Sequence, residues 1–319
     1  MLLIFLSTRT LRLSLSAAAV LFFYVGYGQE QPTMIMFQEN QLFYNPAFTG
    51  TYGQMVSLNN RTQWAGVTDA PSLQSFTYSN GFKNKAAWGL SVQNDKIFIE
   101  KQGVVAIDYN YRLDLSEASK LYLGIKAGGY FKSIDKARLN RLTSVPNSAL
   151  DAVRNYNNPL LGLGVNFQSA HFYFAAGVPN ILNSKRYKES EGILTTATDR
   201  PNLYVSSGYN FKVSEQIGIK PAFLYRAVKD APNLLNLQLA IEYNEKMSVG
   251  ISKMNNDYMG AMFLFKGMSF LDIGYGYEFS TNSSVTALKE NNHELFVRLK
   301  LGTGKSTNTS QKKPADSVK

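Results

Sequence analysis

The chain has 319 residues, a formal net charge of +10 and no cysteine. Without cysteine it has no disulfides and no thiolate metal ligands. Its lysines and arginines are scattered rather than clustered on a helix, which argues against nucleic-acid binding. Glycine and tyrosine are plentiful and the mean hydropathy is slightly negative. This balance suits a chain with apolar side chains facing lipid and polar ones facing a lumen.

The first 28 residues predict a secretory signal peptide. Arg9 and Arg12 precede an apolar run at residues 13–25, and two glycines follow at 26–28. A transmembrane anchor is the alternative, but the run is short for one. We therefore exclude residues 1–28 from the fold, and the loss of two arginines from +10 leaves the mature chain at +8. No later stretch reaches the ~18 apolar residues of a spanning helix, so the exported chain is either soluble or a closed barrel.

Residues 29–53 show no sustained period and form an N-terminal segment of their own. Pro46 cannot donate to a sheet ladder and Gly50 permits a bend. We predict an ordered, turn-rich segment or a plug, which would fill the lumen of a barrel.

The clearest strand pattern lies at residues 103–113. Val105, Ile107 and Tyr109 alternate there with polar or small residues such as Asp108. Successive strand side chains point to opposite faces, so one face is apolar and the other largely polar. The same alternation recurs along the chain. We predict about 14 strands, at residues 54–62, 74–80, 86–93, 102–113, 120–131, 159–168, 171–178, 201–211, 215–226, 234–243, 247–253, 258–265, 268–279 and 292–301.

The connections between these strands alternate in length. The tight ones are predicted at 81–85, 114–119, 169–170, 212–214, 244–246 and 266–267, and the long ones include 63–73, 132–158, 179–200 and 280–291. Short periplasmic turns and long external loops are typical of outer-membrane barrels, and an even strand number puts both termini in the periplasm. A soluble sandwich has no reason to sort its loops by length. We therefore predict an all-β transmembrane barrel over residues 54–301.

Residues 302–319 are rich in Ser, Thr and Lys, and we predict a disordered periplasmic tail. Gly304-Lys305-Ser306 resembles the end of a phosphate-binding loop, but Leu299 stands where its first glycine belongs. Enzymatic signals are weak. His171 and His293 each start a predicted strand, and no spaced nucleophile accompanies them. We predict no enzyme, no cofactor and no metal site.

Asparagine and aspartate cluster at Asn94-Asp95 and at residues 255–257, where we expect ordinary turns rather than calcium loops. Charged side chains also fall at inward positions of the predicted strands. Both signs are present, which favours a charge-paired lumen over a selectivity lining or a partner site. These residues are Asp108, Arg112, Lys126, Lys220, Arg226, Glu242, Glu294 and Arg298.

Short blocks along the whole mature chain resemble the PorP/SprF family. The opening blocks are Asn45-Pro46-Ala47-Phe48-Thr49-Gly50, Arg61-Thr62-Gln63-Trp64 and Ala70-Pro71; the middle ones include residues 89–97, 109–113 and 123–128; the later ones include Gly162–Val165, Gly177–Pro179, Lys220-Pro221 and His293–Leu295. Each block is weak alone, but their order is specific. We expect a structural role for the motif residues Asn45, Pro46, Gly50, Arg61, Gln63, Trp64, Pro71, Asn94 and Asp95.

The resemblance implies an outer-membrane β-barrel of Bacteroidota that serves type IX secretion and, in some lineages, gliding motility. It implies non-enzymatic support for the export or surface anchoring of cargo with a sorting domain, such as adhesins. The implied partners are this cargo, the translocon or periplasmic ring and peptidoglycan-bound components, and outer-membrane lipid. Two roles stay open, a core component and an accessory dedicated to one cargo. The alternative function is a channel or transporter for small or hydrophobic solutes.

Overall fold

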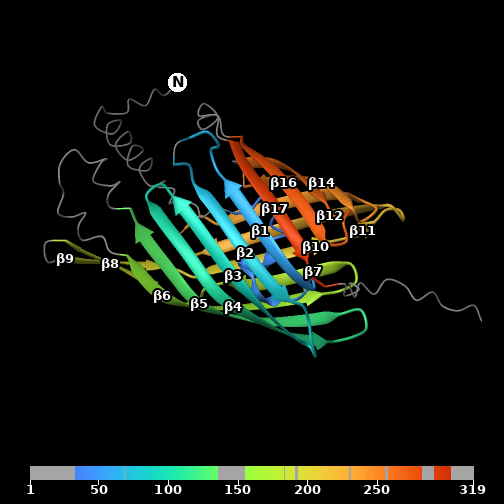
Figure 1. Cartoon of the computed structure of the whole chain (residues 1–319), viewed down its shortest axis with the longest axis horizontal. Coiled ribbons are helices and arrows are strands. Elements are labelled where there is room, and N and C mark those ends of the chain that lie inside the picture. The colour runs from blue at the N-terminus through green and yellow to red at the C-terminus, as the bar shows by residue number, and fades with distance from the viewer. Residues whose placement is uncertain are drawn as a thin grey trace, which may run out of the picture.

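The computed structural model describes residues 33–67, 69–135, 155–182, 184–190, 193–229, 231–255, 258–281 and 291–302. These residues form a closed all-β barrel of 14 antiparallel strands (Figure 1). The predicted signal peptide, residues 29–32 and nearly all of the predicted tail lie outside the described residues. The predicted fold class is thus confirmed, and the boundaries of its flanking segments stay predictions.

All of the predicted spanning strands are present, several of them longer than expected. They are β1 (Gln54–Thr62), β2 (Ser72–Asn80), β3 (Ala86–Ile97), β4 (Glu100–Asp114), β5 (Lys120–Ile134), β6 (Tyr156–Gln168), β7 (Phe172–Val178), β10 (Asn202–Tyr209), β12 (Ile217–Val228), β13 (Leu234–Tyr243), β14 (Met247–Met254), β15 (Tyr258–Phe265), β16 (Leu271–Ser280) and β17 (Asn291–Lys300). A short strand, β11 (Phe211–Lys212), pairs with the start of β12. Strands β8 (Ser184–Ser190) and β9 (Ile193–Asp199) form a separate two-stranded sheet.

The barrel closes through its first and last strands. Met55 on β1 lies opposite Lys300 on β17, and Thr62 lies opposite His293. Sequence neighbours pair along the rest of the wall, except that β7 pairs with β10, past the β8–β9 hairpin, and β10 pairs with β12, past the short β11. We call the barrel end at which β1 begins and β17 ends the base, and the opposite end the top.

The predicted alternation of faces is present in the structure. On β4, the Ile107 side chain is 62% exposed on the outer surface, whereas Asp108 beside it is 0% exposed. Leu237 and Asn236 on β13 show the same contrast. The outer surface is thus mainly apolar, as lipid requires, and the polar groups collect inside.

The connections at the base are short, as predicted, but the top is less uniform. The connections 63–71, 135–155, 179–201 and 281–290 are long, while 98–99, 229–233 and 255–257 are short. Residues 179–200 were expected as a loop, yet they contain the β8–β9 hairpin.

The prediction of a turn at Asn94 and Asp95 was wrong. Both residues lie in β3, which pairs Asn94 with Gly103 and Asp95 with Gln102. β3 and β4 continue to a tight turn at Phe98 and Ile99. The backbone ladder with β4 satisfies the main-chain groups of this stretch, and that outweighs the turn preference of Asn and Asp.

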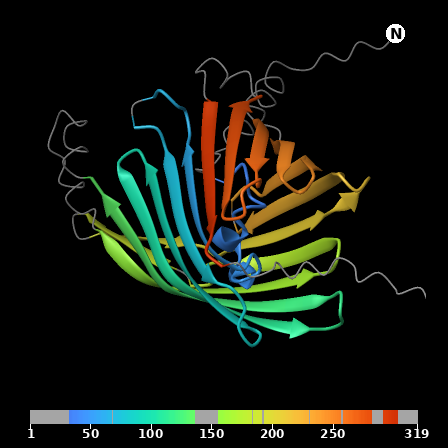
Figure 2. The same cartoon turned by 45° about the vertical axis from the view of Figure 1, so that its right-hand side comes forward.

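Residues 33–53, which we call the inner segment, lie inside the ring of strands (Figure 2). They contain the helical turn α2 (Gln41–Tyr44) and the 3-10 turn η2 (Pro46–Phe48). Pro46 begins η2, where a missing N–H costs nothing, and the Asn45 side chain caps it by accepting from Ala47 N. Among the described residues, no helix combines the length and apolar character needed to cross a membrane.

Candidate functional site

The main polar constellation of the molecule lies between the inner segment and the barrel wall. Met34, Ile35 and Phe37 on the inner segment are each 0% exposed. Burial removes water from the backbone of this segment, so its N–H and C=O groups need partners from the wall. Inward side chains of several strands supply them.

Glu294 on β17 binds two successive N–H groups of the inner segment. Its Oε2 accepts from Ile35 N at 2.5 Å and its Oε1 accepts from Met36 N at 3.2 Å. Asn59 on β1 also donates to Oε1, at 2.8 Å. Gln238 on β13 donates to the carbonyl oxygen of Ile35. These hydrogen bonds hold residues 35 and 36 through their backbone atoms and do not depend on the side chains there.

Arg61 on β1 compensates the carboxylates of this contact. Its Nη2 lies 2.6 Å from Glu278 Oε1, and its Nη1 lies 4.0 Å from Glu294 Oε2. Asn292 donates to Glu278 as well, at 2.7 Å. All three charged side chains are at most 2% exposed. A buried carboxylate without such a cation is strongly unfavourable, so Arg61 makes the Glu294 contact tenable.

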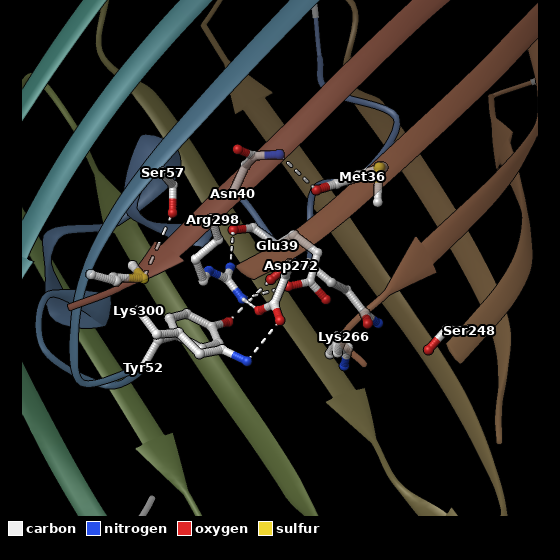
Figure 3. A network of polar contacts seen from close by, with 12 residues as sticks. Met36, Glu39, Asn40, Tyr52, Ser57, Ser248, Lys266, Asp272, Arg298 and Lys300 are labelled. Carbon is white, nitrogen blue, oxygen red and sulfur yellow. Dashed lines mark hydrogen bonds and ion pairs between the residues drawn. The ribbon is translucent and has the colours of Figure 1, made fainter. Parts of the chain in front are cut away.

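A second charged contact holds the inner segment nearer the base (Figure 3). Arg298 on β17 forms an ion pair with Glu39 at 2.9 Å and donates to the Glu39 carbonyl at 2.8 Å. Its guanidinium also lies 3.7 Å from Asp272 and over the Tyr52 ring at 4.6 Å. Burial raises the pKa of Glu39, but Arg298, with help from Lys266, outweighs burial and holds that pKa below its ordinary value.

Beside Glu39 lies a small cavity of about 60 Å³, lined in part by Met36, Lys220 and Lys266. Glu242 on β13 pairs with both lysines, with Lys220 at 2.6 Å and with Lys266 at 2.9 Å. Burial lowers the pKa of Lys266, but Glu39 and Glu242 outweigh it and raise that pKa above its ordinary value. The cavity has room for a few water molecules, which its charged lining can hydrogen-bond.

On the opposite part of the wall, glycines leave room for the backbone of the inner segment to approach closely. A Cβ added to Gly124 on β5 would lie 2.2 Å from Ala47 N, and one added to Gly164 on β6 would lie 1.9 Å from Asn45 Oδ1. Such distances are far below van der Waals contact, so only glycine allows residues 45–47 to approach the wall. Gly164 belongs to the block Gly162–Val165 that resembles the family, and it takes part in this seat.

Hydrogen bonds complete the glycine seat. Asn45 Nδ2 donates to the carbonyls of Val165 and Ala176, both at 3.0 Å. Asn110 on β4 donates to the carbonyls of Ala47 at 2.8 Å and Thr49 at 2.7 Å. Nearby, Lys126 pairs with Asp108 at 3.4 Å and donates to the Leu42 carbonyl, also at 3.4 Å.

Four of the nine family-motif residues lie in the inner segment or in the side-chain network that binds it. These are Asn45, Pro46, Gly50 and Arg61. Gly50 has φ +81°, and a Cβ there would lie 2.4 Å from Ala87 Cβ, so this position requires glycine. The structural role expected for them stays a prediction, and these contacts support it.

The other five motif residues lie elsewhere. Gln63, Trp64 and Pro71 belong to the first top connection, where Gln63 N donates to Pro71 O at 2.9 Å and Trp64 N donates to Asn292 Oδ1 at 3.1 Å. Asn94 faces outward on β3, and Asp95 beside it points inward. The motif therefore does not form one site.

The charged residues predicted to face inward are buried or half-buried. Several of them form ion pairs with oppositely charged side chains. The sequence reasoning missed several partners. These are Glu39, Asn59, Gln238, Asp272 and Glu278. All but Glu39 occupy inward positions of an alternating strand and were detectable in that way. Glu39 lies in a segment without a period.

The two histidines do not meet in a reactive arrangement. His293 Nδ1 lies 2.6 Å from the Tyr275 hydroxyl on the outer surface, and His171 stacks near the Tyr209 ring, with centroids 6.2 Å apart. Over the described ranges, no group of three or more His, Asp or Glu side chains is placed to hold a metal ion. The arrangement binds and orients a polypeptide segment.

Comparisons with known proteins find one matching family and several similar solved structures. The sequence profile of the family "Type IX secretion system membrane protein PorP/SprF" matches residues 27–299. No curated protein matches the chain. Among solved structures, the outer membrane protein Omp33 of Acinetobacter baumannii is similar at 12% identity and a TM-score of 0.44, over 77% of this chain and 98% of that one. The toluene transporter TbuX of Ralstonia pickettii is similar at 8% identity and a TM-score of 0.49, over 81% and 92% of the two chains.

The family match spans the whole inner segment and the barrel up to Leu299, including both charged contacts and the glycine seat. Family and fold together indicate a secretion membrane protein rather than an enzyme, located in the outer membrane. The chain belongs to the PorP/SprF family and is an outer-membrane component of type IX secretion.

Proposed function

We propose that this protein is a closed docking barrel, which supports the export or surface anchoring of sorting-domain cargo such as adhesins. The observation that carries the proposal is the inner segment inside the lumen. The wall directs its buried charges and amides at the backbone of that segment. A conduit for protein cargo requires these groups to face an open path. The inner segment therefore acts as a plug, and the cargo meets the barrel from outside.

The top of the barrel is the proposed docking surface, since loops on a rigid scaffold commonly carry recognition. The β8–β9 hairpin rises between β7 and β10 and forms its own sheet. In the described part of the chain this sheet has only two strands, so each strand keeps one unpaired edge. An extended segment of a cargo domain can add to such an edge through main-chain hydrogen bonds. Side chains of the neighbouring top connections then determine which cargo is accepted.

Replacing residues 179–201 with the corresponding loop of a paralogue tests this surface. We expect cargo dependence to follow the transplanted loop, measured as the surface level of each cargo protein. Replacing residues 229–233 at the top with a Gly-Ser linker of equal length is the control, and it should leave cargo choice unchanged. Heat-modifiable migration in detergent gels checks that each variant still forms a barrel. Unchanged cargo choice with the transplanted loop would reject recognition by the hairpin.

Ion conductance in planar bilayers tests the closed lumen. We expect the whole protein to show no steady open current, and a variant lacking residues 33–50 to conduct if its barrel still folds. A large steady current through the unaltered protein would support the alternative, a channel or transporter for small or hydrophobic solutes.

A clean gene deletion separates the remaining roles through surface, secreted and periplasmic proteomes. Loss of one surface adhesin, with or without a gliding defect, would identify an accessory dedicated to that cargo. Loss of all sorting-domain cargo would identify a core component that works with the translocon or the periplasmic ring. Normal cargo together with altered solute uptake would reject the secretion role that we propose for the barrel.

A further inference from the structure

The outer face of β1 and β2 carries an unusually short apolar stretch. On β1 the outward side chains run from Gln54 through Val56 and Leu58 to Asn60, and only the middle two are apolar. On β2 the outward Phe76 and Tyr78 are likewise enclosed by polar residues. By contrast, every outward side chain on β13 from Leu235 to Tyr243 is apolar or aromatic.

The apolar stretch on the outer face of β1 is much shorter than the apolar part of a membrane is thick. Gln54 and Asn60 are six positions apart, which is about 20 Å along a strand at about 3.3 Å per residue. A strand tilt of about 40° reduces this to about 15 Å of height, whereas the apolar band of an outer-membrane barrel is about 25 Å tall. The polar side chains at the upper end of this stretch therefore reach the depth of the lipid tails.

These polar side chains form a ladder across three strands. Asn60 lies opposite Gln74, and Gln74 lies opposite Asn94, all three exposed. Gln74 Nε2 donates to Asn60 Oδ1 and Asn94 Nδ2 donates to Gln74 Oε1, both at 3.3 Å. Asn60 Nδ2 in turn donates to the Thr62 hydroxyl at 3.4 Å. The next row upward continues the polar surface with Thr62, Ser72 and Lys96.

The ladder leaves hydrogen-bonding capacity unused. Each carboxamide carries two N–H donors and an oxygen with two lone pairs, and the bonds above use only part of them. Lipid chains provide no partner for the remainder. A protein surface with matching polar groups would provide them.

The chemistry of the ladder points to a second copy of the same chain. Carboxamides and hydroxyls donate and accept alike, so the face complements itself when it is turned about a two-fold axis. Lys96 at its margin is paired with Asp69 at 3.8 Å. The face thus presents no cluster of cations for lipid phosphates and no net charge for an oppositely charged partner. We propose that Asn60, Thr62, Ser72, Gln74 and Asn94 form the interface of a two-fold dimer in the outer membrane.

Disulfide cross-linking tests the dimer directly, because the chain contains no native cysteine. Single variants Asn60→Cys, Gln74→Cys and Asn94→Cys are expressed in the native outer membrane as two copies with different epitope tags, then oxidised. We expect a band of twice the monomer mass that contains both tags, strongest for the position nearest the two-fold axis. The matched control is Leu237→Cys, whose side chain is exposed on β13 at 48%, and it should give at least fivefold less dimer.

A second variant distinguishes a specific interface from random collision. With Ser72→Cys as the reporter, changing Asn60, Gln74 and Asn94 together to leucine should lower the dimer yield at least fivefold, while heat-modifiable migration shows that the barrel is retained. The proposal is overturned by the absence of dimer in all three single variants, or by an equal yield at Leu237→Cys. An adduct that contains one tag and a different protein would also overturn it, in favour of another partner.

Discussion

The two sides of the inner wall hold the same segment by different means. Strands β13–β17, with β1, use charged and amide side chains, of which Glu294 and Arg298 contact the segment directly. Strands β5–β7 use mainly the absence of side chains, since Gly124 and Gly164 let the backbone of residues 45–47 approach the wall, although Lys126 on β5 also donates to the Leu42 carbonyl. The first contact depends on charge compensation and the second on close packing. The two sides should therefore respond differently to substitution, pH and salt.

Removing Arg61 should have the largest effect on the charged side. Arg61→Ala leaves the buried carboxylates of Glu278 and Glu294 without their cation, so we expect the free energy of unfolding to fall by about 3–5 kcal/mol. Urea unfolding in detergent micelles measures this. Arg112→Ala is the control, because that arginine is partly exposed and pairs with Asp114, and its loss should cost under about 1 kcal/mol. Equal losses for both variants would show that the buried ion pairs of Arg61 stabilise the fold no more than the partly exposed pair of Arg112.

A methyl group in the glycine seat should be the next most damaging change. Gly124→Ala places a Cβ 2.2 Å from Ala47 N, and the backbone has to shift, so we expect a loss of about 1–3 kcal/mol. Protease cleavage within residues 33–53 should also increase. Gly103→Ala on β4 is the matched control, since the nearest atom to its added Cβ is 3.8 Å away. If both alanines behaved alike, the close approach of residues 45–47 would not matter for stability.

A smaller, pH-dependent effect should distinguish the two sides of the wall. The pKa of Glu39 is lowered in the folded protein, so its ion pair with Arg298 stabilises the fold above the ordinary carboxyl pKa of about 4.3. That stability is lost as the pH falls through the lowered value. We expect Glu39→Gln to cost about 1 kcal/mol at pH 7 and almost nothing near pH 3, measured by thermal unfolding.

The pKa of Lys266 is raised, so its contribution is complete below the unfolded value and is lost only as alkaline pH passes the folded value. Lys266 therefore does not contribute to the change in stability at acid pH. A cost of Glu39→Gln that is equal at pH 7 and pH 3 would contradict an ionic contact.

The period of two was sufficient to predict the strands and their inward faces. Lys126 and Glu294 were expected inside for this reason, because alternation fixes a face from local sequence alone. The partners of these groups were not predictable, since Arg61 meets Glu278 across 217 positions and Arg298 meets Glu39 across 259. The glycine seat for residues 45–47 was also not predictable, because a glycine within a strand pattern does not indicate which segment packs against it. Asn94 and Asp95 were misplaced because local turn preference gave no information on pairing with β4.

The seam between β1 and β17 has a consequence for how the protein is assembled. The sheet becomes a ring only when the last strand meets the first, so closure waits until the whole chain has arrived. The inner segment is continuous with β1, and many of its contacts come from β5–β7 and β13–β17, which are made later. We expect the open sheet to wrap around residues 33–53. This segment would then be the internal template around which the folding machinery of the outer membrane closes the barrel.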